Sequence, residues 1–267
     1  MWYDGQAREF DESAGLEPGV GRRAAEAIMT LSGATGDDVI VDVGAGTGAI
    51  GSHFAASSHR YVGLERSRAM LSVFQRKLEP QPRNLVLIEA DCDATWPLGA
   101  QSVQVVFASR VIHHLNLRHF VEETQRVCRR GSCVLFGSVR RDAGSLPNRL
   151  KQRKRTLLVE RGLAIGSGDE SVRQVLEACR ALGATELPAT TVARWTRSAT
   201  PREILNAWEG KPQLTSSATS REMSAEQRAV TVNTLRDWTR AEYGDLDQPR
   251  EFTQEYVLRG VTWNQIS

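Results

Sequence analysis

The sequence has few of the residues and segments that mark secreted, metal-binding or membrane-spanning chains. Its four cysteines, Cys92, Cys128, Cys133 and Cys179, form no Cys-x-x-Cys pair and are not spaced with the five histidines as metal ligands are. We therefore expect reduced thiols in or near the core of a cytoplasmic protein, and no metal site. No basic segment precedes an apolar one at the N-terminus, which argues against a signal peptide, and no apolar run approaches the roughly 20 residues of a membrane span.

An excess of charge of one sign is also missing. Lys and Arg total 34 and Asp and Glu total 32, so the net charge is +2, which argues against strong, unspecific binding to nucleic acid. Hydrophobic residues make up 40% and charged residues 25% of the chain, which excludes a disordered composition. The 267 residues suffice for one α/β domain with a sizeable insertion or for two small domains.

The middle of the chain alternates apolar runs with amphipathic segments. The runs are typical of buried strands and lie at 39–43, 61–65, 85–90, 103–108 and 133–136. Residues 20–31 have the apolar spacing of a helix, and a glycine-rich turn at 44–48 is expected to open a short helix that ends near Ala56. Strands that alternate with helices at these lengths indicate a mostly parallel sheet that is covered on both faces.

Residues 140–250 break this rhythm. The segment 140–161 carries eight basic residues against two acidic ones and is expected to form a helix, although such a charge run is most often a solvated face. Capping boxes predict further helices at Ser167–Glu170 and Thr200–Glu203. A longer helix is expected to begin at Ser224–Gln227, and residues 211–219 are expected to form a loop. A strand is expected near 186–196, and the chain closes with a strand over 255–263.

The glycine-rich turn at 44–48 directly follows the first buried strand. Glycines permit a tight strand-to-helix turn and let backbone amides approach a ligand closely. The spacing of Gly44, Gly46 and Ala49 also fits a dinucleotide fingerprint, so a nicotinamide-dependent oxidoreductase stays open on the glycines alone.

Acidic residues end the next two strands. Glu65 follows the first glycine by about 20 residues, the separation of a ribose-binding carboxylate, which can accept from both ribose hydroxyls. Asp91 ends the third strand, where its carboxylate can accept from an adenine amino group while the amide of Cys92 donates to the ring. Carboxyl ends of parallel strands form the ligand edge of such sheets, so these positions indicate a nucleotide-like cofactor.

Four segments in this order resemble the motifs of class I S-adenosylmethionine-dependent methyltransferases. They read VDVGAGTG at 41–48, GLERSRAML at 63–71, ADCDA at 90–94 and VVFASRVIHHL at 105–115, and the likeness covers roughly 38–139. The most similar branch contains the small-molecule enzymes of ubiquinone and menaquinone biosynthesis. The resemblance implies a Rossmann-like α/β fold with a seven-stranded, mostly parallel sheet, an antiparallel last strand and a helical lid insertion. It also implies S-adenosylmethionine as cofactor and S-adenosylhomocysteine as product.

The resemblance also assigns roles along the cofactor. Its glycines would face the methionine part and the ribose, Glu65 would hold the ribose, Asp91 and Cys92 would contact adenine, and Ser109 would line the methionine side. The full set of expected cofactor residues is Tyr3, Asp42, Gly44, Ala45, Gly46, Gly48, Glu65, Arg66, Asp91, Cys92, Ser109 and Arg110. Gln104 stands where the family usually has Asp, a departure at the start of the fourth strand.

The acceptor side is less specific. Methyl transfer needs positioning and, for a hydroxyl acceptor, a base. His113 follows the fourth strand and is expected as a general base because imidazole titrates near neutral pH, with His114 as an acceptor contact; the alternative is a packing element. Trp208 is expected in an acceptor-covering lid, although aromatic residues at helical spacing more often belong to a core.

These inferences divide the chain into four parts: an N-terminal helical cap (1–36), a cofactor-binding core (37–139), a lid and substrate region (140–250) and a final strand (251–267). The expected function is methylation of a small organic molecule in a biosynthetic pathway, at a hydroxyl or carboxylate oxygen, without a nucleic-acid or membrane partner. The alternatives are RNA methylation through 140–161, cyclisation of the cofactor's own side chain, and a regulator that binds the cofactor without chemistry. Fold likeness decides neither the acceptor nor the oligomeric state.

Overall fold

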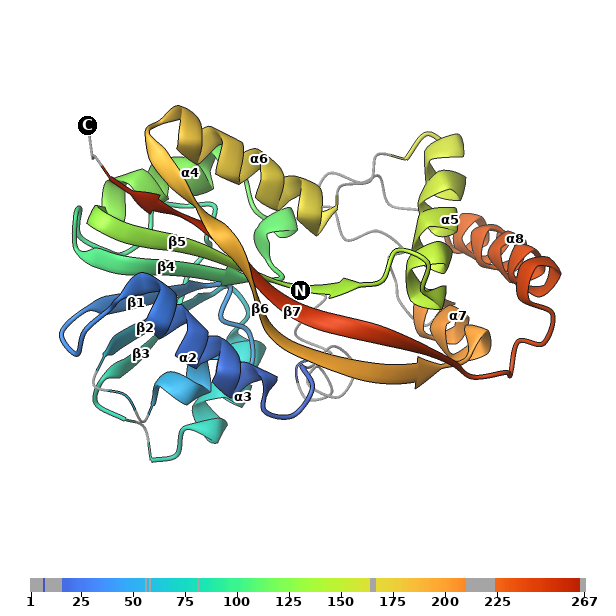
Figure 1. Cartoon of the computed structure of the whole chain (residues 1–267), viewed down its shortest axis with the longest axis horizontal. Helices are drawn as coiled ribbons and strands as arrows, with labels where there is room; N and C mark the ends of the chain where they lie inside the picture. The colour runs from blue at the N-terminus through green and yellow to red at the C-terminus, as the bar shows by residue number, and fades with distance from the viewer. Residues whose placement is uncertain are drawn as a thin grey trace. The chain divides into compact units, whose positions relative to one another are not determined.

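The computed structural model describes residues 7, 16–55, 57, 59–80, 82–163, 167–209 and 224–264. The chain divides into two compact units: unit 1 comprises Met1–Ser138, Gly168–Ala193 and Tyr256–Ser267, and unit 2 comprises Val139–Ser167 and Arg194–Glu255 (Figure 1). Residues 168–193, which the sequence pattern grouped with 140–250, therefore belong with the sheet of unit 1.

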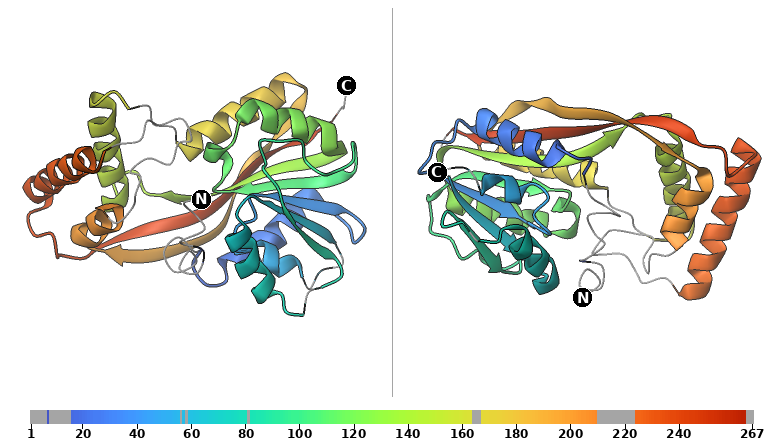
Figure 2. Two further views of the ribbon diagram at one scale, coloured as in Figure 1. Left: turned by 180° about the vertical axis from the view of Figure 1, so that it is seen from behind. Right: turned by 90° about the horizontal axis from the view of Figure 1, so that it is seen from below.

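Seven strands form one sheet in the order β3-β2-β1-β4-β5-β7-β6. Their bounds are β1 Val39–Val43, β2 Arg60–Glu65, β3 Leu85–Glu89, β4 Val103–Ser109, β5 Cys128–Arg141, β6 Ala184–Ala199 and β7 Arg250–Trp263. The pairs β1–β2, β1–β4, β2–β3 and β4–β5 are parallel, and the last strand is antiparallel. The predicted Rossmann-like α/β fold, with its mostly parallel seven-stranded sheet, is confirmed. Strands β5 and β6 run from unit 1 into unit 2, and β7 runs from unit 2 back into unit 1 (Figure 2).

The strands β1 and β4, in the middle of the sheet, are buried on both faces. On β4, Val106 and Ala108 pack in one apolar cluster with residues of α4 (Leu117–Val127) and α6 (Gly168–Ala181). Val105 and Phe107 alternate with them, so they point to the opposite face, and they are fully buried as well. Covered faces explain why these strands are continuous apolar runs in the sequence.

The helices around β1 and β2 depend on close backbone contacts and caps. Helix α2 (Val20–Ser32) packs on the 3-10 helix η2 (Gly51–Phe54), where a Cβ on Gly21 would lie 2.1 Å from the carbonyl oxygen of Ala49. Helix α3 (Arg68–Lys77) begins at Ser67, whose side chain accepts from the amide of Met70. The short helix expected after 44–48 is present as the 3-10 helix η2, which begins beyond the left-handed glycines of the turn.

Unit 2 contains α5 (Leu146–Glu160), α7 (Pro201–Glu209) and α8 (Ala225–Tyr243). An apolar cluster joins them through Leu146, Leu150, Leu157, Leu205 and Leu235. The predicted capping box at Thr200–Glu203 is confirmed by reciprocal hydrogen bonds. The helix expected from Ser224 is also present as α8, and the structure adds a capping box between Ser224 and Gln227. The expected helix in 140–161 is confirmed as α5, and the expected loop at 211–219 lies outside the described residues.

The composition-based expectations about cysteine and membrane segments also have structural counterparts. All four cysteines are free and buried, as predicted. Within the described ranges, no helix is long and apolar enough to cross a membrane. No cluster of three potential metal ligands occurs in that part of the chain either.

Candidate functional site

The glycine turn after β1 owes its shape to three left-handed residues. Gly44, Gly46 and Gly48 have φ angles of 73°, 57° and 77°. A Cβ on Gly44 would lie 2.5 Å from Val111, and a Cβ on Gly48 would lie 2.2 Å from the ring of Phe74. At Gly46 the nearest atom would be a turn carbonyl oxygen at 4.0 Å, so this is the open side of the turn.

The carboxylate of Glu65 ties this turn to the end of β2. Its Oε2 accepts from the amide of Gly46 at 3.0 Å, and its Oε1 accepts from the amide of Ser67 at 2.8 Å. Each carboxylate oxygen has two lone pairs, so each can still accept one hydroxyl. The glycine turn and the acidic strand end, predicted separately, therefore form one hydrogen-bonded arrangement.

Asp42 lies below the turn as a buried acid. Its Oδ2 accepts from the hydroxyl of Tyr61 at 2.7 Å, and only 3% of the residue is exposed. Burial, with a smaller contribution from the charge of Glu65, raises the pKa of Asp42 to about 7 against the opposing Tyr61 hydrogen bond. Asp42 is therefore an acid that burial holds partly protonated near neutral pH.

The loop after β3 is held by Glu123 of α4 and by Asn116, the N-cap residue of that helix. The indole Nε1 of Trp96 donates to the carbonyl oxygen of Cys92 at 3.0 Å, and the Trp96 amide donates to Glu123 Oε2 at 2.7 Å. Asp93 accepts from the amide of Asn116 at 2.7 Å. Cys92 is buried, which raises the pKa of its thiol to about 12 and keeps it protonated.

The end of β4 carries Ser109 and the strained residue Arg110. The hydroxyls of Ser109 and Tyr256 lie 2.8 Å apart in a hydrogen bond. Arg110 has a φ angle of 59°, a left-handed conformation that is unfavourable for a residue with a side chain, and its amide donates to Gly137 at 3.0 Å. Strain of this kind concentrates at functional positions.

The two histidines follow in the 3-10 helix η3 (Ile112–His114). Their ring centroids lie 4.0 Å apart. Burial lowers the pKa of His114, which favours its neutral form near pH 7. His113 is half-buried, and its Nδ1 would lie 3.4 Å from a Cβ on Gly168, the first residue of α6.

A comparison with protein families identifies this arrangement. Residues 41–136, which contain the glycine turn, Glu65, the β3 loop, Ser109 and both histidines, match the model of a methyltransferase domain. The chain carries a class I, S-adenosylmethionine-dependent methyltransferase domain. The nicotinamide-dependent oxidoreductase that the glycines alone left open is not supported.

Solved structures with the same fold extend the likeness over most of the chain. A geranyl diphosphate C-methyltransferase from Streptomyces coelicolor A3(2) shares 17% identity at a TM-score of 0.51, with 90% of this chain and 78% of that one covered. The YcgJ protein of Bacillus subtilis shares 14% at 0.55, with 89% and 97% covered. Phosphoethanolamine N-methyltransferase 2 of Haemonchus contortus shares 16% at 0.54, with 98% and 58% covered. The comparison with curated proteins found no match.

The methyltransferase domain brings together most of the residues predicted from sequence. Gly46 and Glu65 are joined by a hydrogen bond, and Asp42 is held separately by Tyr61. Arg66 and Asp91 are exposed, and Ala45 is buried. Tyr3 lies outside the described residues. Gln104 donates to the carbonyl oxygen of Gly131 and accepts from Arg129, and the β4–β5 register shifts beside it, between Val103 and Val105.

Two tyrosines that bond predicted site residues were missed by sequence reasoning. Tyr61 bonds Asp42 from β2, and Tyr256 bonds Ser109 from β7. Neither stands in a motif, and a tyrosine in a strand is ordinarily a packing residue. No signal in one sequence would have placed their hydroxyls at these two side chains.

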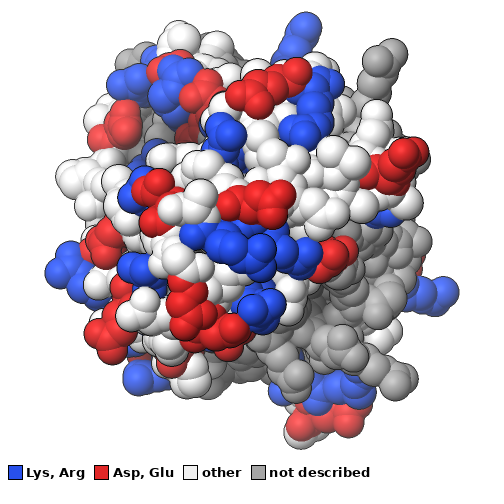
Figure 3. Space-filling view, turned by 90° about the vertical axis from the view of Figure 1, so that its right-hand side faces the viewer, with Lys and Arg blue, Asp and Glu red and all other residues white. Residues whose placement is uncertain are grey.

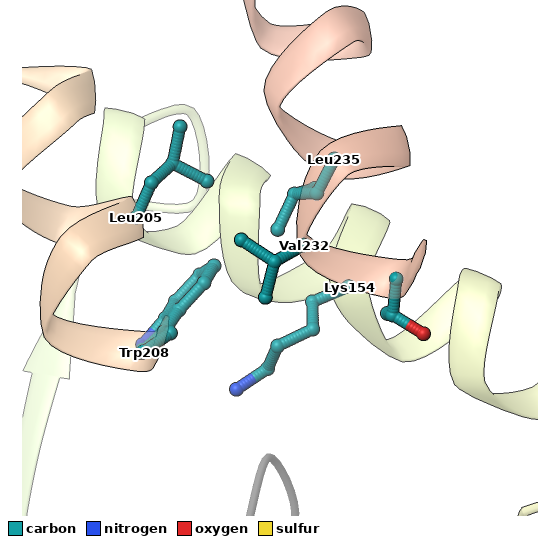
Figure 4. Close-up of a pocket in the computed structure, with 6 residues that line it drawn as sticks. Lys154, Leu205, Trp208, Val232 and Leu235 are labelled. Carbon is teal, nitrogen blue, oxygen red and sulfur yellow. The ribbon is translucent and has the colours of Figure 1, made fainter. Parts of the chain in front are cut away.

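Trp208, the other predicted acceptor residue, belongs to unit 2. It lines a crevice between α5, α7 and α8 together with Lys154, Leu205, Thr231, Val232 and Leu235 (Figure 4). The ammonium nitrogen of Lys154 lies 4.2 Å from the centroid of the indole ring, a cation–π contact. These described side chains fill the crevice so closely that no water molecule fits between them.

Proposed function

We propose that the protein transfers the methyl group of S-adenosylmethionine to a hydroxyl or carboxylate oxygen of a small organic molecule in a biosynthetic pathway. The observation that carries the proposal is the Glu65 carboxylate, which accepts hydrogen bonds from the Gly46 and Ser67 amides at the carboxyl end of β2. The histidines His113 and His114 follow the carboxyl end of β4. Two structural neighbours support a small acceptor, since one binds geranyl diphosphate and another phosphomonomethylethanolamine.

The residues present fit the cofactor. Glu65 would hold the ribose hydroxyls with its remaining lone pairs, Gly44 and Gly46 would bring backbone toward the methionine part, and Ser109 would line that side. Asp91, which is exposed, and the amide of Cys92 would contact adenine. The remaining expected contacts are Tyr3, Asp42, Ala45, Gly48, Arg66 and Arg110. When bound, the cofactor supplies an electrophilic methyl group on a sulfonium centre.

The protein's own contribution to the chemistry is positioning and proton removal. A hydroxyl acceptor loses its proton as the new C–O bond forms, and we propose His113 as the base that takes it. The neighbouring His114, which burial keeps neutral, would contact the acceptor. A carboxylate acceptor needs no base, so the two acceptor classes differ in their dependence on His113.

The charges of unit 2 support a small acceptor rather than RNA. Arg149 of α5 pairs with Glu242, and Arg153 and Lys154 lie over the rings of Trp238 and Trp208. On the face drawn in Figure 3, basic side chains alternate with acidic ones. A phosphate backbone is bound by a field of one sign, which this face does not present.

Two further assignments belong to the same proposal. Unit 2 would contribute to acceptor binding as a lid, with Trp208 as an acceptor contact. A cytoplasmic location is supported by the four free, buried thiols, which are typical of a reducing compartment.

The test is an acceptor screen with methyl-labelled S-adenosylmethionine, in which phenols, carboxylic acids and phosphorylated alcohols are offered and products are identified by mass spectrometry and NMR. Label on an oxygen of a small molecule is the expected result. Label on carbon or nitrogen would contradict the oxygen assignment alone. Consumption of the cofactor without any acceptor would support the cyclisation alternative instead.

A further inference from the structure

A tyrosine hydroxyl from β7 reaches the end of β4. Tyr256 is fully buried, and its hydroxyl lies 2.8 Å from the Oγ of Ser109, the last residue of β4. Ser109 and Tyr256 are 147 positions apart in the chain, and the fold alone brings them together. A buried hydroxyl pair of this kind fixes the rotamer of the serine, because another rotamer would break the hydrogen bond between the two buried hydroxyls.

Gly137 of β5 provides the space for this pair. It is the register partner of Ser109, and a Cβ at this position would lie 1.8 Å from the Tyr256 hydroxyl and 3.0 Å from the Ser109 hydroxyl. No side chain larger than hydrogen fits there without displacing the tyrosine. Three strands therefore meet at one hydrogen bond.

The same glycine also holds the strained residue that follows Ser109. The carbonyl oxygen of Gly137 accepts from the amide of Arg110 at 3.0 Å, and Arg110 has a φ angle of 59°. A left-handed conformation in a non-glycine residue persists only where the surroundings enforce it. The Ser109–Gly137–Tyr256 cluster is part of those surroundings.

The electrostatic environment keeps the Tyr256 hydroxyl protonated. Burial raises the pKa of Tyr256, the hydrogen bond to Ser109 and the charge of Arg110 oppose the rise, and the charge of Asp42 adds to it. Asp42 and Arg110 both stand among the residues expected at the cofactor. The charges of Asp42, at the end of β1, and Arg110, just after β4, therefore both act on the Tyr256 hydroxyl.

We propose that Tyr256 is a positioning residue for the methionine end of the cofactor, acting through Ser109 and the backbone at Arg110. The inference rests on the proposed function, in which Ser109 lines that end of the site. The Tyr256 hydroxyl orients its neighbours: it holds the Ser109 Oγ and the carboxyl end of β4 in one geometry before the ligand binds.

The test is Tyr256→Phe, which removes one oxygen and keeps the buried ring. Calorimetric titration with S-adenosylhomocysteine is expected to show a dissociation constant raised about 3- to 10-fold, the effect of one lost hydrogen bond. Once an acceptor is known, KM for S-adenosylmethionine is expected to rise by the same factor with kcat nearly unchanged. Ser109→Ala is expected to raise the dissociation constant by a similar factor. The double variant is expected to bind as weakly as the weaker of the two single variants and no more weakly, because both substitutions remove the same hydrogen bond.

Tyr243→Phe is the matched control. The Tyr243 hydroxyl of unit 2 has no hydrogen-bond partner among the described residues, so affinity is expected to stay at the wild-type value. A purely structural role for Tyr256 predicts a lower Tm with unchanged affinity of the folded variant, and this result would overturn the inference. If the wild type itself fails to bind S-adenosylhomocysteine, the proposed function fails and this inference with it.

Discussion

Single side chains at the ligand edge depend on partners far away in the sequence, and Asp42 is the clearest case. Its pKa of about 7 means that the folded protein binds a proton between pH 3.8 and 7 that the unfolded chain has already lost. A raised carboxyl pKa of this kind lowers stability as pH rises through that window. The hydrogen bond from the Tyr61 hydroxyl limits this rise in the pKa of Asp42.

Asp42→Asn removes this titration while it retains an acceptor for Tyr61. The variant is expected to gain stability relative to wild type between pH 5 and pH 8, by on the order of 2 kcal/mol, because only the wild type must ionise a buried group. Urea denaturation of both proteins at the two pH values measures the difference. A difference that does not change with pH would show that Asp42 titrates normally.

His113 carries the chemical prediction at this scale. Replacement by Gln is expected to lower kcat about 100- to 10,000-fold with a hydroxyl acceptor and to leave a carboxylate acceptor unaffected, because only the former loses a proton. His114→Gln, the neighbouring control, is expected to change KM for the acceptor more than kcat. Unchanged turnover of a hydroxyl acceptor in the His113 variant would remove its role as a base.

At the scale of elements, the glycine turn has space for a side chain at Gly46 and none at Gly44 and Gly48. Gly46→Ala is expected to cost roughly 1–2 kcal/mol, the cost of its left-handed backbone alone. Gly48→Ala adds a contact with the Phe74 ring, so its expected cost is at least about 3 kcal/mol. Urea denaturation compares the two variants, and equal losses would mean that the turn does not pack as described.

The loop after β3 is a second element with a specific support, the pair of Glu123 and Arg126. Chiefly the hydrogen bond from Arg126, and also the amide of Trp96, lower the pKa of Glu123 against the effect of burial. Glu123→Gln is therefore expected to cost about 1–3 kcal/mol near pH 7. A lowered pKa contributes stability above the unfolded value of 4.5 and loses it as pH falls, so the deficit is expected to shrink in acid. A deficit that grows in acid contradicts this account of the loop.

For the whole molecule, the sequence was most informative where strands are buried on both faces. Such strands are continuous apolar runs, so β1, β2 and β4 were predicted within a residue or two of their observed ends. The strand β3 was predicted equally closely from its apolar run, although only Leu85 in it is buried. The long strands were not: β6 spans Ala184–Ala199 with mostly exposed or half-buried residues, which leaves no apolar pattern to recognise. The division into two units, with 168–193 placed in unit 1, also depends on contacts that no local pattern encodes.

The candidate site divides in the same way. Its backbone part, the glycine turn and the acidic strand ends, was predictable because turn geometry and ligand chemistry restrict the residues at those positions. Its side-chain support was not, because Tyr61, Tyr256 and Glu123 act through contacts between distant segments. Sequence motifs thus identify the cofactor class, whereas the residues that hold the motifs in place require the structure.

The most direct test of the central claim is calorimetric titration with S-adenosylhomocysteine, with NADH as the competing ligand. The wild type is expected to bind the former and not the latter. Glu65→Gln is expected to weaken binding at least tenfold, since a charge-assisted acceptor for the ribose is lost. Glu89→Gln, at the register partner on β3, is the matched control and is expected to bind normally. Binding of NADH alone, or equal affinity in wild type and Glu65→Gln, would contradict the account.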